Sequence, residues 1–326
     1  MTSTGKPIGG SLADMIQDDP AEVRTLEGFS RATWIKIGLL AALFAWANFW
    51  QFKNLVVAWK DPNWSHGFLI PLFSLYLLYV RRHELFTTPM KVNLFGLPIL
   101  LLGIAGTVYG LFLTIWVARL SMLLVLIGLV LFLAGWRMLV VTLVPILYLA
   151  LAIPIPGILY ERIAVPLQGL AASSSEVLLS AIGVQIEVTA LHMRVVSLSG
   201  TPHDLMVAEA CSGVRSMMAF VALSVAIAYI EPRPAWQRVV LILAGIPITI
   251  ACNILRVSLT AGMFVIDKPQ LGQDIMHEFM GMALLIPALL LLLLLNKLLW
   301  SFYVREEDED DDSPSEAEPP PTASTA

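Results

Sequence analysis

The sequence has few charged residues and many apolar ones. Of its 326 residues, 14% are charged and 57% are hydrophobic. Soluble globular domains carry about 25% charged residues, so this chain lacks the polar groups to cover a water-exposed surface. Lipid is therefore expected to replace water around much of the molecule, and the composition indicates a membrane protein.

Three other features are missing, and each absence excludes a class of protein. The only cysteines are Cys211 and Cys252, which are too few for a disulfide framework or a cysteine-based metal cluster. Lysine and arginine are not gathered into the basic surface that nucleic acid requires. The first thirty residues contain no apolar core of a cleavable signal peptide, so the first long apolar segment is expected to act as the insertion signal.

Long apolar segments recur along the chain. A membrane-spanning helix needs about 20 mostly apolar residues. The candidate segments are 33–52, 67–80, 94–113, 115–134, 138–153, 216–230, 239–255 and 279–302. Gly135, Trp136 and Arg137 leave a very short turn between the fourth and the fifth. The sequence therefore predicts an all-α polytopic membrane protein with about eight transmembrane helices.

Basic residues near the ends of these segments predict the orientation. If eight spans alternate, most of these residues fall on one side, which is then the cytoplasm. They are Arg24, Arg31, Lys36, Arg81, Arg82, Lys91, Arg137, Arg233, Arg238, Lys297 and Arg305, against Lys53, Lys60, Arg119 and Lys268 on the other side. Residues 1–32 are then a polar cytoplasmic segment, residues 33–304 the membrane domain, and residues 305–326 an acidic cytoplasmic tail expected to be disordered.

This topology leaves three regions at the outer face. They are the loop around His66, the stretch 154–215 and the stretch 256–277. Within the second, residues 165–182 suit an amphipathic or re-entrant helix, and residues 184–188 and 193–198 suit short strands, followed by a turn at 200–202. We therefore expect a small extracytoplasmic cap over about 154–214 that contains short β-strands.

Cys211 is the candidate nucleophile. It precedes a predicted helix start, whose unpaired N–H groups favour an anion. Arg215 follows one helical turn later, and Gly213 lets the backbone approach a substrate closely. Both the helix start and the arginine favour the thiolate, which is the nucleophilic form. The alternative is a small cysteine that only packs near a turn.

Arg256 and His277 are the other candidates. Arg256 stands at the predicted outer end of the seventh span, in the run Asn253-Ile-Leu-Arg, and its guanidinium suits an oxyanion or a carboxylate. The alternative is a side chain that reaches the lipid headgroups. His277 precedes the eighth span and suits a general acid and base, although it could be an ordinary surface residue. Cys252 is a rival nucleophile, but its apolar neighbours indicate burial.

Together these three groups suit one reaction. Cys211, Arg256 and His277 each lie at the predicted outer end of a different span, and a nucleophile, a cation and a base suit acyl transfer through a thioester. His192, His203 and Asp204 show no recognised zinc-ligand spacing, so no metal and no cofactor are expected.

The motifs resemble those of the exosortase and archaeosortase family. The run 209–215 with its Cys-Ser-Gly-Val-Arg, then Asn253-Ile-Leu-Arg256, then His277, follow in the family's order. Ser65-His66-Gly67 and the Arg81-Arg82 pair are also similar to the family's N-terminal half. The resemblance covers about residues 59–300, and a histidine in the third place resembles the bacterial members.

This resemblance implies an enzyme of the bacterial inner membrane. Such enzymes are thought to cleave C-terminal sorting signals of exported proteins, made of a motif such as Pro-Glu-Pro, a hydrophobic helix and a basic cluster. They are linked to surface sorting and exopolysaccharide production. The implied catalytic residues are Cys211, Arg256 and His277, supported by Glu209, Gly213, Arg215 and Asn253. The implied partners are the signal helix and the lipid bilayer, the active site faces the periplasm, and nucleic acid is not a partner.

Several alternatives stay open at the level of sequence. Arg215 could take the electrostatic role in place of Arg256, and Glu209 could orient a catalytic group or cap the sixth span. With water as the acceptor the enzyme is a protease, whereas with an amine or a lipid it is a transpeptidase. A transporter or an exopolysaccharide-export component would also suit eight spans with an intramembrane arginine, and a structural scaffold of the cell envelope is a further possibility.

Overall fold

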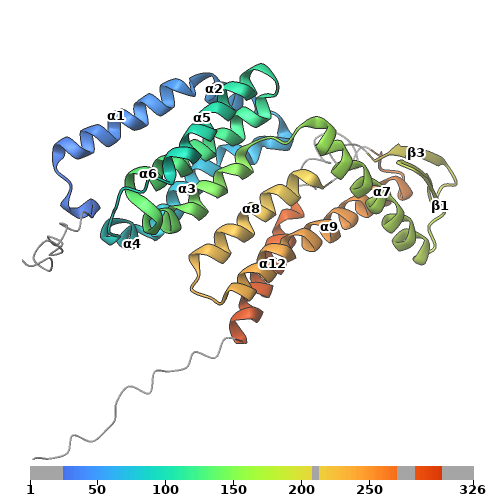
Figure 1. Ribbon diagram of the computed structural model, residues 1–326. Coiled ribbons are helices and arrows are strands. Elements are labelled where there is room, and N and C mark those ends of the chain that lie inside the picture. The colour runs from blue at the N-terminus through green and yellow to red at the C-terminus, as the bar shows by residue number, and fades with distance from the viewer. Residues whose placement is uncertain (1–24, 208–212, 270–282, 303–326) are drawn as a thin grey trace, which may run out of the picture.

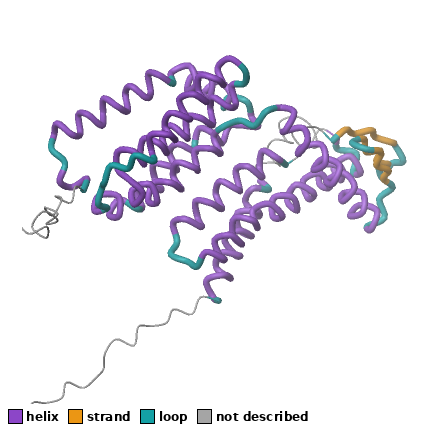
Figure 2. Tube along the Cα trace, in the orientation of Figure 1, coloured by secondary structure: helices purple, strands orange, loops and turns teal. Residues whose placement is uncertain are grey.

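A computed structural model describes residues 25–207, 213–269 and 283–302, and these residues are mostly helical (Figure 2). Two helical stretches, Ile115–Ala152 and Ala235–Val265, are long and apolar enough to cross a membrane, and the bent pair Arg31–Ala47 and Phe49–Ala58 makes a third. Gly96–Phe112, Val214–Ile230 and Leu285–Ser301 are apolar but shorter. The chain is therefore a polytopic membrane protein, while the number of eight spans stays a prediction.

The helices form two groups (Figure 1). The first group holds α1 (Arg31–Ala47), α2 (Phe49–Ala58), α3 (Ile70–Val80), the short α4 (Arg82–Thr87), α5 (Gly96–Phe112) and α6 (Ile115–Tyr148), with the 3-10 helices η1 (Leu26–Gly28), η2 (Pro62–Phe68) and η3 (Leu149–Ala152). The second group holds α8 (Val214–Ile230), α9 (Ala235–Val265) and α12 (Leu285–Ser301). Helix α3 contacts both α6 and α8 and so joins the groups.

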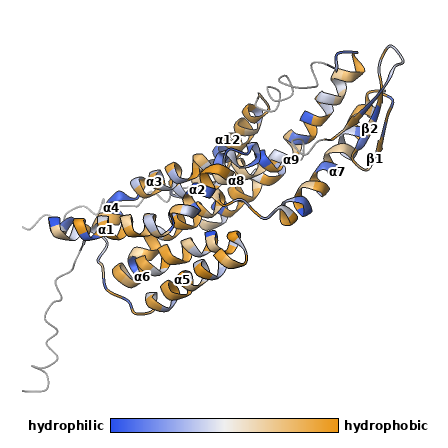
Figure 3. Cartoon of the chain, turned by 90° about the horizontal axis from the view of Figure 1, so that it is seen from above, coloured by the Kyte–Doolittle hydropathy of each residue, from blue (hydrophilic) through white to orange (hydrophobic). Residues whose placement is uncertain are grey.

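The outer surfaces of these helices are apolar (Figure 3). Phe112, Leu294 and Leu290 expose 83%, 63% and 60% of their surfaces, and many other large hydrophobic side chains are similarly exposed. In water such a surface would drive aggregation, whereas in a bilayer it faces lipid tails. The exposed residues therefore agree with the membrane location that the composition predicts.

The first apolar segment, which is expected to form a span over 33–52, is bent. Helices α1 and α2 meet at an angle of 63° around Asn48. Asn48 is buried, and its Nδ2 donates a hydrogen bond of 2.9 Å to the carbonyl oxygen of Phe44. Asparagine side chains that bond the local backbone compete with the regular helical ladder, which accounts for a break at this residue.

Helix α6 reverses its direction at Gly135, where the sequence predicts a short turn. Gly135 has a φ of 84° and a ψ of −175° inside the helix. Leu123 and Ile146 belong to one core cluster with Ile153. A continuous helix would hold Leu123 and Ile146 roughly 34 Å apart, at about 1.5 Å per residue. The two halves of α6 are therefore antiparallel neighbours joined at Gly135.

Replacing Gly135 with alanine should destabilise this turn. The conformation of Gly135 is essentially restricted to glycine, and a Cβ there would collide with the carbonyl oxygen of Lys91. We expect Gly135→Ala to lower the free energy of unfolding by at least about 2 kcal/mol. Gly38→Ala is the matched control, because a Cβ at Gly38 meets nothing within 4 Å. Thermal denaturation in detergent measures the difference, and equal melting of the two variants would contradict the reversal.

A three-stranded antiparallel sheet follows the long helix α7 (Gly157–Ala181), which runs beside α9. The strands are β1 (Ile186–Thr189), β2 (His192–Val196) and β3 (Pro202–Met206), in the order β1-β2-β3. Met193, Val195 and Leu205 turn inward and pack in a cluster with residues of α7 and α9. The sequence predicts the first two strands, but the expected turn at 200–202 is wrong at its end, since Pro202 begins β3. That this sheet lies outside the membrane stays a prediction.

Polar side chains hold the ends of α8, α9 and α12 together, far from the sheet. Glu231 accepts hydrogen bonds from Asn296 Nδ2 at 3.1 Å and from Trp300 Nε1 at 2.8 Å. Arg233 forms an ion pair with Glu231 and donates to Asn296 Oδ1 at 2.7 Å. Gln237 Nε2 donates to the carbonyl oxygen of Leu299 at 3.0 Å. These bonds fix this end of α12 against the α8–α9 hairpin.

Candidate active site

The start of α8 lies directly on α9. Gly213 precedes α8 with a φ of 77°, in the left-handed region that favours glycine. A Cβ at Gly213 would lie 2.8 Å from Cγ of Asn253, so no larger residue fits there without movement. Val214, the first helical residue, is 1% exposed and belongs to a core cluster that includes residues of the first helix group. The start of α8 is therefore held by Asn253 next to Gly213 and by the core cluster around Val214.

Asn253 and Arg256 form the polar part of this contact. Arg256 Nη2 donates a hydrogen bond of 2.8 Å to Oδ1 of Asn253, whose residue is 6% exposed. The bond joins side chains three residues apart, which lie on one face of a helix. It turns the guanidinium toward Asn253 and the start of α8, rather than leaving its orientation to the lipid headgroups.

Arg256 lies inside α9 rather than at the end of this helix, while its position at the outer end of a span stays a prediction. The helix continues to Val265. Val257, Ala261 and Val265 repeat at four-residue spacing and are buried in the cluster formed with α7 and the sheet. This apolar stripe keeps the chain helical past Arg256, because it packs against other elements of the protein.

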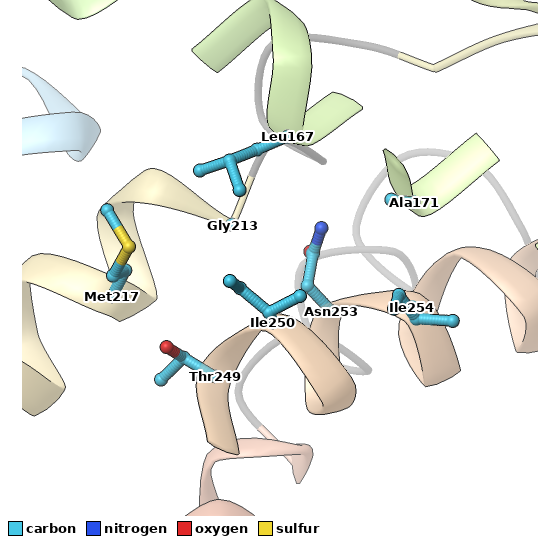
Figure 4. A pocket seen from close by; sticks show the side chains of 8 residues that line it. All are labelled: Leu167, Ala171, Gly213, Met217, Thr249, Ile250, Asn253 and Ile254. Carbon is cyan, nitrogen blue, oxygen red and sulfur yellow. The ribbon is translucent and has the colours of Figure 1, made fainter. Parts of the chain in front are cut away.

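Two small hollows meet at Asn253. The first lies between α7, α8 and α9 (Figure 4), and its lining residues are Leu167, Ala171, Gly213, Met217, Thr249, Ile250, Asn253 and Ile254. The second includes Ser216, Cys252, Asn253, Arg256 and the start of α12 at Leu284 and Leu285. Four helices, α7, α8, α9 and α12, thus converge around the Asn253–Arg256 pair.

Arg215 has a different partner. Its Nη2 donates to Oδ1 of Asn63 at a distance of 3.4 Å, and the N–H of Asn63 is held by Oδ1 of Asp61 at 2.8 Å. Asn63 belongs to η2, the segment before α3 that contacts α8. Arg215 therefore ties the start of α8 to η2, whereas Arg256 bonds to Asn253.

His66 on η2 is a residue that sequence reasoning did not assign to the site. Both of its ring nitrogens are buried, and neither has a hydrogen-bond partner of good geometry in the described chain. Burial lowers the pKa of His66, and the nearby backbone of Leu151 opposes part of this shift. The net effect favours the neutral form of the imidazole. The neighbouring Trp64 shares a core cluster with Val214. The sequence feature that could have pointed to His66 is the Ser65-His66-Gly67 run in a predicted outer loop.

Glu209, Cys211 and His277 lie outside the described residues. Of the predicted site residues that the structure describes, Gly213, Asn253 and Arg256 come together, and Arg215 points to η2. Cys252 is only partly buried, at the edge of an apolar cluster that includes Phe220 and Ala288, so its expected burial is met in part. The roles of all these residues in catalysis stay predictions.

Within ranges 25–207, 213–269 and 283–302, no group of three histidine, cysteine or acidic residues could hold a metal ion. The polar residues of the sheet form pairs instead. Arg194 Nε donates to Oδ1 of Asp204 at 2.9 Å, and His203 Nε2 lies 3.6 Å from Oδ1 of Asp267.

The fold and the site define an α-helical integral membrane protein with an asparagine–arginine pair where four helices converge. A family model described as transmembrane exosortase matches residues 58–294, which is more than half of the chain. The chain therefore belongs to the transmembrane exosortase family. No curated protein and no solved structure matches it.

Proposed function

We propose that this exosortase is a cysteine protease or transpeptidase that cleaves C-terminal sorting signals of exported proteins. The observation that carries the proposal is the contact between Gly213 and Asn253. It joins the Cys-Ser-Gly-Val-Arg run to the Asn-Ile-Leu-Arg run, which are about forty residues apart in the sequence. The first run is expected to supply the thiol nucleophile, and the second is expected to supply the guanidinium.

Chain connectivity supports a short distance between the thiol and the guanidinium. Cys211 precedes Gly213 by two residues. Consecutive Cα atoms are 3.8 Å apart, so the Cα of Cys211 lies at most about 7.6 Å from that of Gly213. Gly213 in turn contacts Asn253, which bonds to Arg256. This bound is compatible with a substrate carbonyl that contacts both the Cys211 thiol and the donors on α9.

The proposed reaction is acyl transfer in two stages. The Cys211 thiolate attacks the scissile carbonyl, and the oxyanion that forms accepts hydrogen bonds from Arg256. His277 takes the thiol proton and gives it to the leaving amine, which departs with the signal helix. The thioester on Cys211 is then resolved by water, an amine or a lipid. Arg256 has a second possible role, which is to hold a substrate carboxylate.

The proposed setting is the outer face of the bacterial inner membrane. Eight spans, with both termini in the cytoplasm, would put the cap over about 154–214 and the active site in the periplasm. The signal helix would lie among the spans in the bilayer, so its scissile bond would be held beside Cys211 at a high local concentration. A role in surface sorting and exopolysaccharide production belongs to the same proposal.

The test is co-expression with an exported reporter protein. The reporter carries a C-terminal signal made of a Pro-Glu-Pro motif, a hydrophobic helix and a basic cluster. We expect a shortened reporter with the wild-type enzyme, and only the full-length form when the signal helix is deleted or when His277→Ala replaces the wild type. A reporter that stays full-length with the wild-type enzyme for every signal of this class would contradict the proposal.

The same assay shows whether His277 or His66 acts as the general base. If His277 moves the proton, His277→Ala should slow processing far more than His66→Ala, because His66 would then only pack beside Trp64. A larger loss in His66→Ala would transfer the role to the buried imidazole on η2. Immunoblots of the two variants show whether both proteins accumulate equally.

A further inference from the structure

The two edges of the sheet differ in how their backbone groups are satisfied. On β1 the register directs the backbone of Ile186 and Val188 away from β2. The N–H of Val188 donates a hydrogen bond of 3.2 Å to Oε1 of Glu176 on α7. A helix side chain therefore occupies this edge, which is one of the ways in which proteins protect a free strand.

Among the described residues, no strand pairs with the outer edge of β3. The bonds from Val207 N–H to Leu191 and from Ser197 N–H to Thr201 show which residues face β2. The alternate residues, Asp204 and Met206, therefore direct their N–H and C=O groups away from the sheet. Within the described parts of the chain, these backbone groups have no hydrogen-bond partner on that side. Met206 is 65% exposed.

Strand β3 is held firmly by its other contacts. Leu205 packs in the cluster that includes residues of α7 and α9. The Asp204 carboxylate is bound by Arg194 on β2, on the exposed face of the sheet, so it does not cover the edge. The loop after β2 is joined to α9, because Leu198 N–H donates to the carbonyl oxygen of Val265 at 2.8 Å. An added strand would therefore meet a rigid template.

The chain runs from this strand into the proposed nucleophile. Cys211 follows Met206 by five residues. Five extended residues span at most about 18 Å, so an extended peptide on the β3 edge is close enough to present a bond to Cys211. The edge covered by Glu176 belongs to β1, on the opposite side of the sheet from β3.

We infer that the outer edge of β3 binds the substrate of this enzyme as an added strand. The ligand is the extended segment of the exported protein next to its hydrophobic signal helix. Asp204 and Met206 each offer one N–H and one C=O, so recognition runs through the main chain and tolerates different side chains. The inference rests on the proposed function, and it names the surface that positions the scissile segment.

Proline at Met206 tests the added strand. Met206→Pro removes an N–H that points away from β2, and edge positions of this kind tolerate proline. We expect the initial rate of reporter processing to fall at least about tenfold, because one intermolecular bond is lost and the ring obstructs its neighbours. Met206→Ala is the matched comparison, since it keeps the N–H, and its rate should exceed that of Met206→Pro at least about fivefold.

A cross-link provides the second measurement and does not depend on activity. The enzyme carries Cys211→Ala, Cys252→Ala and Met206→Cys, and the reporter has one cysteine, placed in turn along the segment before its signal helix. Oxidation should join the two proteins only for cysteines in that segment. If the Met206→Pro protein does not accumulate, the cross-linking result tests the added strand by itself.

The outcomes separate the two hypotheses. If Cys211→Ala is inactive while Met206→Pro processes the reporter at the wild-type rate, the added strand is wrong and the proposed function stands. If Cys211→Ala processes the reporter normally, the proposed function itself is wrong. A disulfide between two copies of the enzyme, with none to the reporter, would assign the edge to self-association and overturn the inference.

Discussion

Cys211→Ala should abolish processing of a signal-bearing reporter while the protein still inserts into the membrane. Loss of a catalytic nucleophile removes the covalent route altogether, so we expect the rate to fall by at least about 10³-fold. Cys252→Ala is the matched control, because Cys252 packs on α9 beside an apolar cluster. Its rate should stay within about twofold of the wild type. Reporter cleavage on a gel measures both rates.

This pair of variants also discriminates between classes of protein. A transporter or an exopolysaccharide-export component would tolerate both alanine substitutions if the two cysteines only pack. An enzyme with Cys252 as its nucleophile would show the reverse order of activities. Equal processing by the wild type and Cys211→Ala would end the case for a thioester at Cys211.

Arg256→Ala should have the second largest effect. Its guanidinium bonds to Asn253, which contacts Gly213 at the start of α8. Removal of one donor to a developing oxyanion typically costs about 10²–10³-fold in kcat, and we expect a loss of this size. Arg256→Lys should recover only part of it, since an ammonium group cannot replace the planar fork of donors. Single-turnover cleavage with purified enzyme in detergent measures the rate constant of the chemical step.

Arg215→Ala is the comparison for Arg256→Ala, because Arg215 bonds to Asn63 on η2. If Arg215 only positions the start of α8, Arg215→Ala should lose less than about tenfold. A loss in Arg215→Ala that exceeds the loss in Arg256→Ala would exchange the electrostatic roles of the two arginines.

Much of the helical architecture can be predicted from apolar length alone. The residues Gly135, Trp136 and Arg137 leave room only for a tight turn, and the chain reverses at Gly135. The bend at Asn48 was missed because it depends on one buried amide that bonds to Phe44. A window of hydropathy averages over such a residue and reports one continuous span.

Tertiary contacts explain the other differences. The extension of α9 past Arg256 depends on the burial of Val257, Ala261 and Val265 against α7 and the sheet. Hydropathy cannot separate this burial from the end of a span. The strand β3 was missed because Pro202 suits a turn, although proline is also tolerated at the first residue of a strand.

In the site, too, contacts between residues close in the sequence are predictable, whereas contacts between distant segments are not. The bond from Arg256 to Asn253 joins residues at helical spacing, so the sequence alone could have suggested it. The contact of Gly213 with Asn253 joins separate helices, and no spacing rule predicts it. The pairing of Arg215 with Asn63 also brings together distant segments, and it draws the η2 loop and His66 toward the start of α8.

Trapping of the covalent intermediate tests the central claim most directly. Purified enzyme is mixed with a signal-bearing substrate, quenched in acid and digested, and the peptides are identified by mass spectrometry. The account predicts that the substrate fragment before the cleaved bond is attached to Cys211 by a thioester that hydroxylamine releases. An adduct on another residue, or rapid cleavage with no adduct on Cys211 at any time, would contradict it.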